Sequence, residues 1–252
     1  MGRTLNRFVR VYADGYDISG NTVSVGPYDT AYDDTSITGL DWEVQGAYPG
    51  AAKITMGTLN GIFDTTAASG LHVIASGAGV SRVVMNAIGI QASPAAGNPV
   101  FMGKFQQLAY HAEAGSTMLT ATIPFGNGEP ASMTYAKPWG VLMHAKAAET
   151  GANSGSGIDN TSATSTGGYM MYQIFGYTGS SGTATISLED SADGITWTAL
   201  SGATSGAINK TAMPCAGIVE LSTTATVRRY LRWQLTLATL TGANFALAFV
   251  RG

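Results

Sequence analysis

Residues 54–63, ITMGTLNGIF, decide how this chain folds. Ile54 and Met56 alternate with a polar residue, which is typical of a strand with one buried face. After Gly57 the apolar positions change parity, and a glycine at such a change indicates a β-bulge that bends the strand while keeping one face inward. The stretch therefore predicts a bent, half-buried strand, and residues 245–250, FALAFV, are expected to be its closing partner.

Further strand candidates follow at short intervals, bounded by turn-forming residues. They are residues 80–90, 101–110, 118–125, 141–146, 169–177, 183–188, 195–200, 218–221 and 227–237. Residues 40–44 are a further strand candidate, and residues 47–51, AYPGA, predict a turn between them and residues 54–63. Residues 65–78 show the apolar spacing of a helix. The pattern predicts an all-β fold, mainly an antiparallel β-sandwich or jelly roll, with one short flanking helix near residues 65–78.

A polar, low-complexity stretch divides the chain. Residues 150–168, TGANSGSGIDNTSATSTGG, contain one large apolar residue, Ile158, so they predict either a linker or a long exposed loop. We expect one β-sandwich over residues 1–150, with an N-terminal arm and a long loop. A second, jelly-roll-like sandwich is expected over residues 151–252.

The composition favours a subunit of an assembly. The 252 residues are 45% hydrophobic but only 12% charged, about half the charged share of an average soluble domain. The net charge of −3 does little to oppose self-association and gives no basis for specific nucleic-acid binding. Cys215 is the only cysteine, so no internal disulfide forms. Without a signal peptide or an apolar run of membrane-spanning length, we expect no membrane association.

The sequence shows no recognisable arrangement of reactive side chains. The histidines His72, His111 and His144 lie in unrelated segments and lack the spacing of a metal-binding motif. No G-x-S-x-G nucleophile motif occurs. The acidic residues at 189–193 lie beside a turn, where acids are common for structural reasons. We therefore predict a non-enzymatic protein with no catalytic residue, no cofactor and no metal site.

Charge is unevenly placed near the N-terminus. Three basic residues form an N-terminal arm: Arg3, Arg7 and Arg10. Residues 14–43 contain seven of the sixteen acidic residues, and three of these cluster in the loop of residues 17–38: Asp29, Asp33 and Asp34. The cluster lacks the spacing of a calcium-binding EF-hand. Complementary charge predicts that the arm of one subunit docks on the loop of its neighbour, and a solvated arm and loop are the alternative. The loop itself predicts a long hairpin or a segment that orders on assembly.

Residues 227–237, VRRYLRWQLTL, predict a strand with one apolar face. Arg229 falls on that face, so we expect it at the edge of the strand or paired with a carboxylate such as Glu189 or Asp190.

The aromatic residues of the C-terminal half leave two alternatives. Trp197 and Trp233 fall on apolar faces and favour a place in the core, whereas Tyr230 lies on a polar face. Tyr230 is therefore the candidate for stacking on a sugar ring, and an ordinary edge aromatic is the alternative.

Several stretches of the chain resemble virion proteins of tailed bacteriophages, in particular tail-tube or major tail proteins. In the C-terminal half the stretches are ATISLEDSADGITWTAL (184–200), RRYLRWQL (228–235) and FALAFVRG (245–252). In the N-terminal half they are YADGYDISGNTVSV (12–25), LDWEVQGAYPGAAKITMGTLNGIFD (40–64) and FMGKFQQLAY (101–110). SADGITW is the most specific of these motifs. The resemblance implies a tail-tube-like β-sandwich in residues 1–150.

The resemblance also implies a function. It is that of a structural virion subunit, made in the host cytoplasm, which assembles into oligomeric rings with copies of itself and with other virion proteins. Genomic DNA would pass through the lumen without specific binding, and the acidic loop would line that lumen because like charges repel. The alternative is a capsid decoration or surface adhesion protein that binds carbohydrate through its C-terminal sandwich.

Overall fold

The computed structural model describes residues 6–37, 46–66, 70–115, 117–128 and 134–252, with side chains omitted at 34–37 and 46–48. Strands make up nearly all of the regular structure, and neighbouring strands pair antiparallel. The predicted all-β class is confirmed. The expected helix is the single α-helix of the described residues, α1, and it is confined to Leu71–Ala75.

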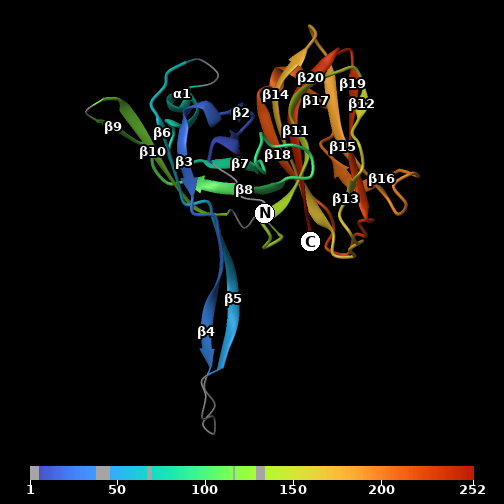
Figure 1. Ribbon diagram of the computed structural model, residues 1–252, viewed down its shortest axis with the longest axis horizontal. Coiled ribbons are helices and arrows are strands. Elements are labelled where there is room, and N and C mark those ends of the chain that lie inside the picture. The colour runs from blue at the N-terminus through green and yellow to red at the C-terminus, as the bar shows by residue number, and fades with distance from the viewer. Residues whose placement is uncertain (1–5, 38–45, 67–69, 116, 129–133) are drawn as a thin grey trace.

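The described residues of the first half of the chain contain ten strands and two short 3-10 helices (Figure 1). The strands are β1 (Val9–Ala13), β2 (Tyr16–Asp17), β3 (Thr22–Gly26), β4 (Asp29–Ile37), β5 (Gly46–Thr55), β6 (Thr58–Ile62), β7 (Ser81–Ile88), β8 (Pro99–Gln107), β9 (His111–Ala114) and β10 (Leu119–Gly128). The 3-10 helices are η1 (Asn6–Phe8) and η2 (Ser19–Asn21).

Six of these strands curl around one core and form an incomplete barrel. They pair in the order β1, β7, β8, β10, β6 and β3. The enclosed cluster includes Met56, Leu59, Phe101, Phe105 and Ile123, each at most 1% exposed. Leu71 of α1 adds to the same cluster. We call this unit the barrel.

The stretch that decides the fold is divided between two strands. Met56 and Leu59 both face the core, as the change of parity predicts, but the chain breaks at Gly57 between β5 and β6 instead of forming a bulge within one strand. Gly57 has φ +69°, and a Cβ there would lie 2.5 Å from the carbonyl carbon of Gly26. The break lets residues before it pair with β4 and residues after it pair with β3 and β10.

β4 and β5 form a long hairpin that projects from the barrel on the side away from α1 (Figure 1). The hairpin predicted within residues 17–38 is wrong, because β3 belongs to the barrel and the partner of β4 is β5, which lies outside that range. The strand predicted at residues 40–44 lies outside the described residues. The predicted turn at 47–51 is wrong, since these residues lie within β5. Pro49 pairs with Asp34 where the register shifts, an arrangement that the missing N–H of a proline permits at an irregular edge.

The second half of the chain is a β-sandwich with short edge strands and one 3-10 helix, η4 (Lys210–Ala212). The strands are β11 (Trp139–Thr150), β12 (Asn153–Ser154), β13 (Ile158–Asp159), β14 (Gly168–Thr178), β15 (Thr183–Ser191), β16 (Thr198–Thr204), β17 (Ile208–Asn209), β18 (Cys215–Glu220), β19 (Tyr230–Ala238) and β20 (Gly242–Arg251). One layer has the order β18-β14-β20-β11, and the other has β12-β19-β15-β16. We call this unit the sandwich.

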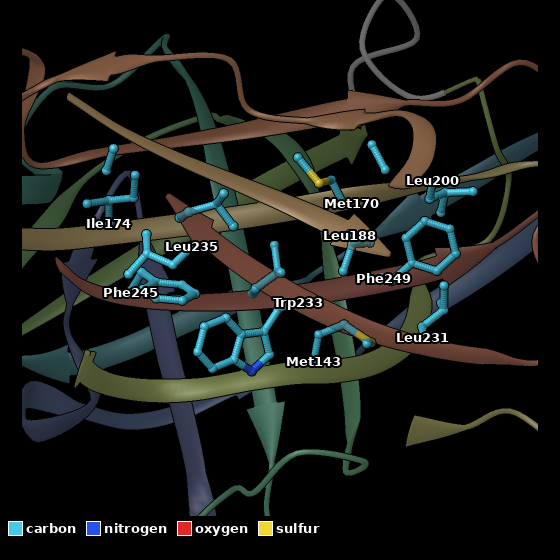
Figure 2. Packing of buried hydrophobic residues seen from close by; sticks show 14 of the residues in the cluster. Met143, Met170, Ile174, Leu188, Leu200, Leu231, Trp233, Leu235, Phe245 and Phe249 are labelled. Carbon is cyan, nitrogen blue, oxygen red and sulfur yellow. The ribbon is translucent and has the colours of Figure 1, made fainter. Parts of the chain in front are cut away.

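Large apolar side chains from both layers fill the sandwich (Figure 2). Phe245 and Phe249 of β20 pack in one cluster with Leu231, Trp233 and Leu235 of β19, and all five are at most 6% exposed. Alternate residues of β19 are buried, as period two predicts. The expected pairing of residues 245–250 with residues 54–63 is wrong, because β20 lies between β11 and β14.

The barrel and the sandwich share a sheet. β11 pairs with β8 through Trp139–Val141 and with β20 along most of its length. A further apolar cluster, which includes Met85, Met102, Tyr169 and Met171, packs between them. The stretch 150–168 contains β12 and β13, which lie along β19.

Candidate functional site

Two of the three arginines in the predicted basic arm lie at one edge of the barrel. Arg7 is in η1, with its guanidinium carbon 4.7 Å from the centre of the Phe8 ring. Arg10 is in β1, and its Nη1 donates to the carbonyl oxygens of Arg7 and Val9 at 2.9 and 3.1 Å. Among the described residues neither guanidinium has a carboxylate within ion-pair distance. Arg3 lies outside the described residues.

A groove runs beside these arginines. Its volume is about 250 Å³. It lies between residues 6–11 on one side and residues 22–25 on the other, and Ser19 and Tyr28 complete its lining. The lining is thus partly apolar, with valines from both β1 and β3, and partly basic. This volume is below the roughly 300–1,000 Å³ of a small-molecule pocket, so the groove is better suited to a few side chains of a protein segment.

The acidic cluster lies on the projecting hairpin. Asp29 begins β4, and Asp33 is exposed and forms an ion pair of 2.5 Å with Lys53 of β5. Asp34 lies opposite Pro49, and its side chain is not described. Because Lys53 is the only basic residue between 29 and 55, against five acidic ones, the hairpin carries a clear excess of negative charge.

The described residues of the arm and the hairpin form no ion pair with each other within one chain. No ion pair joins Arg7 or Arg10 to Asp29 or Asp33 in the described structure, and the hairpin points away from the barrel (Figure 1). Within the described residues, the basic and acidic groups that the sequence predicts to interact therefore form no ion pair with each other in one chain.

The aromatic residues of the C-terminal half differ in their surroundings. Trp233 is 6% exposed in the sandwich core, which confirms its predicted place. Trp197 is half-buried, with the guanidinium carbon of Arg232 at 4.6 Å from the centre of its ring. Tyr230 is half-buried beneath Arg229, whose guanidinium carbon lies 4.9 Å from the centre of its ring.

The turn that follows β15 is rigidly held next to Tyr230. The Asp193 carboxylate accepts hydrogen bonds of 2.8 Å from the backbone amides of Ile195 and Thr196 and from the Ser191 hydroxyl. These bonds hold the pKa of Asp193 well below its ordinary value. Ile195 is 83% exposed at the tip of the turn, so the sandwich presents an apolar side chain on a fixed backbone.

Sequence reasoning missed a polar network at the junction of barrel and sandwich. Lys146 Nζ of β11 donates to Asp17 Oδ2 of β2 at 2.7 Å. Burial alone would raise the pKa of Asp17, but the hydrogen bonds from Lys146 and Ser19 lower it below its ordinary value. The buried Gln173 of β14 accepts from the amide of Gly15 and donates to the carbonyl of Val83. No signal in the sequence links these residues, because they are separated by up to about 160 positions.

His144 occupies a buried polar site in the sandwich. Its Nδ1 lies 3.1 Å from the carbonyl oxygen of Phe245, and its Nε2 lies 3.0 Å from Glu149 Oε1. Its ring stacks on that of Phe245 and meets that of Trp233 edge-on. One ring nitrogen thus lies beside the backbone of β20, and the other lies beside a carboxylate of its own strand, β11.

The described residues offer surfaces for contact with other molecules. No group of three or more His, Cys, Asp or Glu side chains within them is arranged to hold a metal ion. Within the same residues, no helix is both long and apolar enough to cross a membrane. The edge of the barrel presents a groove beside Arg7 and Arg10, which form no ion pair with a carboxylate of the described residues, and an acidic hairpin extends from the barrel.

Comparison with solved structures finds a likeness to the Dit protein of phage SPP1, described as a paradigm of the hub adsorption apparatus in phages that infect Gram-positive bacteria. The two chains are 10% identical, and the alignment covers 97% of this chain and 99% of that one with a TM-score of 0.32. No family model matches the sequence, and no curated protein matches it. A structural likeness of this size carries no conclusion about function.

Proposed function

We propose that this protein is a non-enzymatic structural subunit of a tailed-phage particle and that it assembles with copies of itself into rings of the tail tube. The observation that carries the proposal is the β4–β5 hairpin. It projects from the barrel (Figure 1) and exposes Ala31, Tyr32 and Asp33 of β4 as well as Pro49 and Lys53 of β5. An isolated two-stranded ribbon is marginally stable in water, so such a hairpin needs a partner outside its own chain.

The low charge of the chain supports the same proposal. Subunit interfaces exclude charged residues from their centres, and only 12% of the residues here are charged. The excess of acidic over basic residues suits a lumen through which genomic DNA passes without specific binding, because tight DNA binding requires clustered Lys and Arg. Contacts with other virion proteins would join the rings to the rest of the particle.

The mass of the purified full-length chain in solution tests the proposal. Size-exclusion chromatography with light scattering, followed by negative-stain electron microscopy, is expected to show rings or stacked tubes. A monomer at every concentration tested would contradict the proposal.

The second candidate is a capsid decoration or surface adhesion protein that binds carbohydrate. It is favoured by one observation, the rigid turn that places the exposed Ile195 close to Tyr230 on the sandwich, since Gly194 of this turn packs over the Tyr230 ring. Compact monomers or trimers in the microscope, together with glycan binding that Tyr230→Ala abolishes, would favour this candidate over the tail tube.

A further inference from the structure

The barrel has a seam between its first and last strands. β1 pairs with β7 on one side, and β3 pairs with β6 on one side. On the other side, β1 pairs with β2 only at Tyr12 and Ala13. Val9 of β1 and the whole of β3 therefore have an outer edge with no strand partner among the described residues, and unpaired strand edges readily accept another chain.

The groove of about 250 Å³ lies along this seam. The outer edge of β1 is already occupied at Val11. The Val11 carbonyl oxygen accepts a hydrogen bond from the amide of Ile18, and the Val11 amide donates one to the Ser19 hydroxyl oxygen. At Val9 the edge is open, since within the described residues the Val9 carbonyl oxygen accepts a hydrogen bond only from the Arg10 guanidinium. Tyr28 lines the groove, and its hydroxyl is buried without a hydrogen-bond partner in the described residues. Because that hydroxyl is buried, Tyr28 contributes only its ring to the groove, and the seam offers valine side chains and an open strand edge.

The charge of the seam defines its occupant. Arg7 and Arg10 both line the groove, and neither pairs with a carboxylate of the described chain. A matching segment must therefore be extended, acidic and partly apolar. β4 has these properties, since it carries Asp29, Asp33 and Asp34 and also the 55% exposed side chain of Tyr32.

The hairpin that contains β4 leaves the barrel immediately after Tyr28 and extends away from it (Figure 1). It does not fold back onto the groove of its own chain. A hairpin that fills such a groove must therefore come from another molecule.

We propose that the seam between β1 and β3 is the docking site for the β4–β5 hairpin of a second copy of this chain. Arg7 and Arg10 then face the carboxylates of the incoming β4, and Tyr32 packs against the valines of the groove. This inference rests on the proposed self-assembly, and it names the contact that produces it.

Pairwise cross-linking tests the contact directly. In a Cys215→Ala background, Val23→Cys places a thiol in the groove and Tyr32→Cys places one on the hairpin, both at positions that are at least 55% exposed. Ile195→Cys is the matched control, because this residue is 83% exposed on the sandwich. Each pair of single-cysteine variants is mixed, allowed to assemble and treated with a short bismaleimide.

The Val23 and Tyr32 pair is expected to form roughly tenfold more cross-linked dimer than the Ile195 and Tyr32 pair, because docking raises the effective concentration of adjacent groups. Assembled protein in which the two pairs cross-link equally, or in which neither does, would show that another partner fills the seam and would overturn this inference alone. Wild-type protein that stays monomeric would overturn both the inference and the proposed function.

Charge exchange provides an independent test. Arg7→Glu with Arg10→Glu in one variant, and Asp33→Lys with Asp34→Lys in another, should each weaken self-association by roughly tenfold or more. A mixture of the two variants restores complementary charge at half of the contacts and should associate more tightly than either variant alone. Equal association of the mixture and the separate variants would contradict the pairing, and circular dichroism confirms that each variant is folded.

Discussion

The sandwich differs from the barrel and its hairpin in how completely its own chain covers its apolar side chains and strand edges. In the sandwich, aromatic and aliphatic side chains fill the space between two layers (Figure 2), and the 150–168 stretch covers β19 at one edge. The barrel also has a core, but its seam is open, and the hairpin it extends has no core at all. The comparison indicates that the sandwich provides internal stability, whereas the barrel edge and the hairpin are kept available for contacts with other molecules.

Truncating a core residue of the sandwich should have the largest effect on stability. Phe245 is fully buried against His144 and Trp233, so Phe245→Ala is expected to lower the free energy of unfolding by about 3–5 kcal/mol. Tyr32→Ala on the hairpin is the comparison and should change it by less than about 0.5 kcal/mol. Chemical denaturation of the dilute, monomeric protein measures both. Equal losses would mean that Tyr32 has a packing partner in its own chain.

Among the backbone positions of the barrel, Gly57 should be the one at which a substitution lowers the free energy of unfolding most. Gly57→Ala combines a left-handed φ of +69° with a contact of 2.5 Å between the new Cβ and Gly26, and we expect a loss of about 2–4 kcal/mol. Gly79→Ala is the matched control, since Gly79 has φ +77° but no atom within 4 Å of a Cβ. It should cost about 1 kcal/mol. A loss for Gly57→Ala no greater than for its control would show that close packing at the break is unimportant.

The partly buried pair of His144 and Glu149 should make a smaller, pH-dependent contribution. Burial alone would raise the pKa of Glu149, but hydrogen bonds from His144 and Asn153 lower it below its ordinary value of 4.5. A carboxylate with a lowered pKa stabilises the folded state above that value, and the contribution is lost as the pH falls through the folded pKa.

Glu149→Gln should therefore reduce the melting temperature at neutral pH and flatten its decline below about pH 4.5. Glu113→Gln, on the exposed strand β9, should leave the pH profile of the wild type unchanged. Parallel wild-type and Glu149→Gln profiles between pH 7 and pH 3 would exclude the ion pair as a source of stability.

The sequence correctly predicts which strand residues face the core, because this depends on residues close together in the chain. The alternation in β19 correctly places Leu231, Trp233 and Leu235 in the core, and Met56 and Leu59 face inward on either side of Gly57. These predictions succeed because the period of a strand is a local property of the chain.

Contacts between distant segments could not be predicted in the same way. Arg229 was expected at the edge of its strand or paired with a carboxylate such as Glu189 or Asp190. It lies just before β19 and does pair with a carboxylate, but with that of Asp159, through two bonds of 2.6 and 2.7 Å. Glu189 pairs with Arg232 instead. The partner of Arg229 lies on β13, within a stretch whose composition gives no sign that it pairs with β19. Pro49 similarly indicated a turn, although a shift of register accommodates it within β5.

The candidate contact surface was predictable in its charges but not in its shape. Arg7, Arg10, Asp29 and Asp33 stand out in the sequence by their uneven placement, which is enough to suggest complementary surfaces. The groove depends on the order of six strands around the barrel and on the gap between the first and the last. That order is set by long-range pairing, for which composition and periodicity provide no information.

Removal of the hairpin tests most directly whether it exists to join copies of the chain. Replacing residues 32–52 with Asn-Gly connects Ala31 to Lys53, which pair with each other across the hairpin, through a two-residue β-turn. Light scattering should show an oligomer for the full chain and a monomer for the shortened one, with the melting temperature of the monomer nearly unchanged. A shortened chain that keeps the mass of the oligomer would contradict this account.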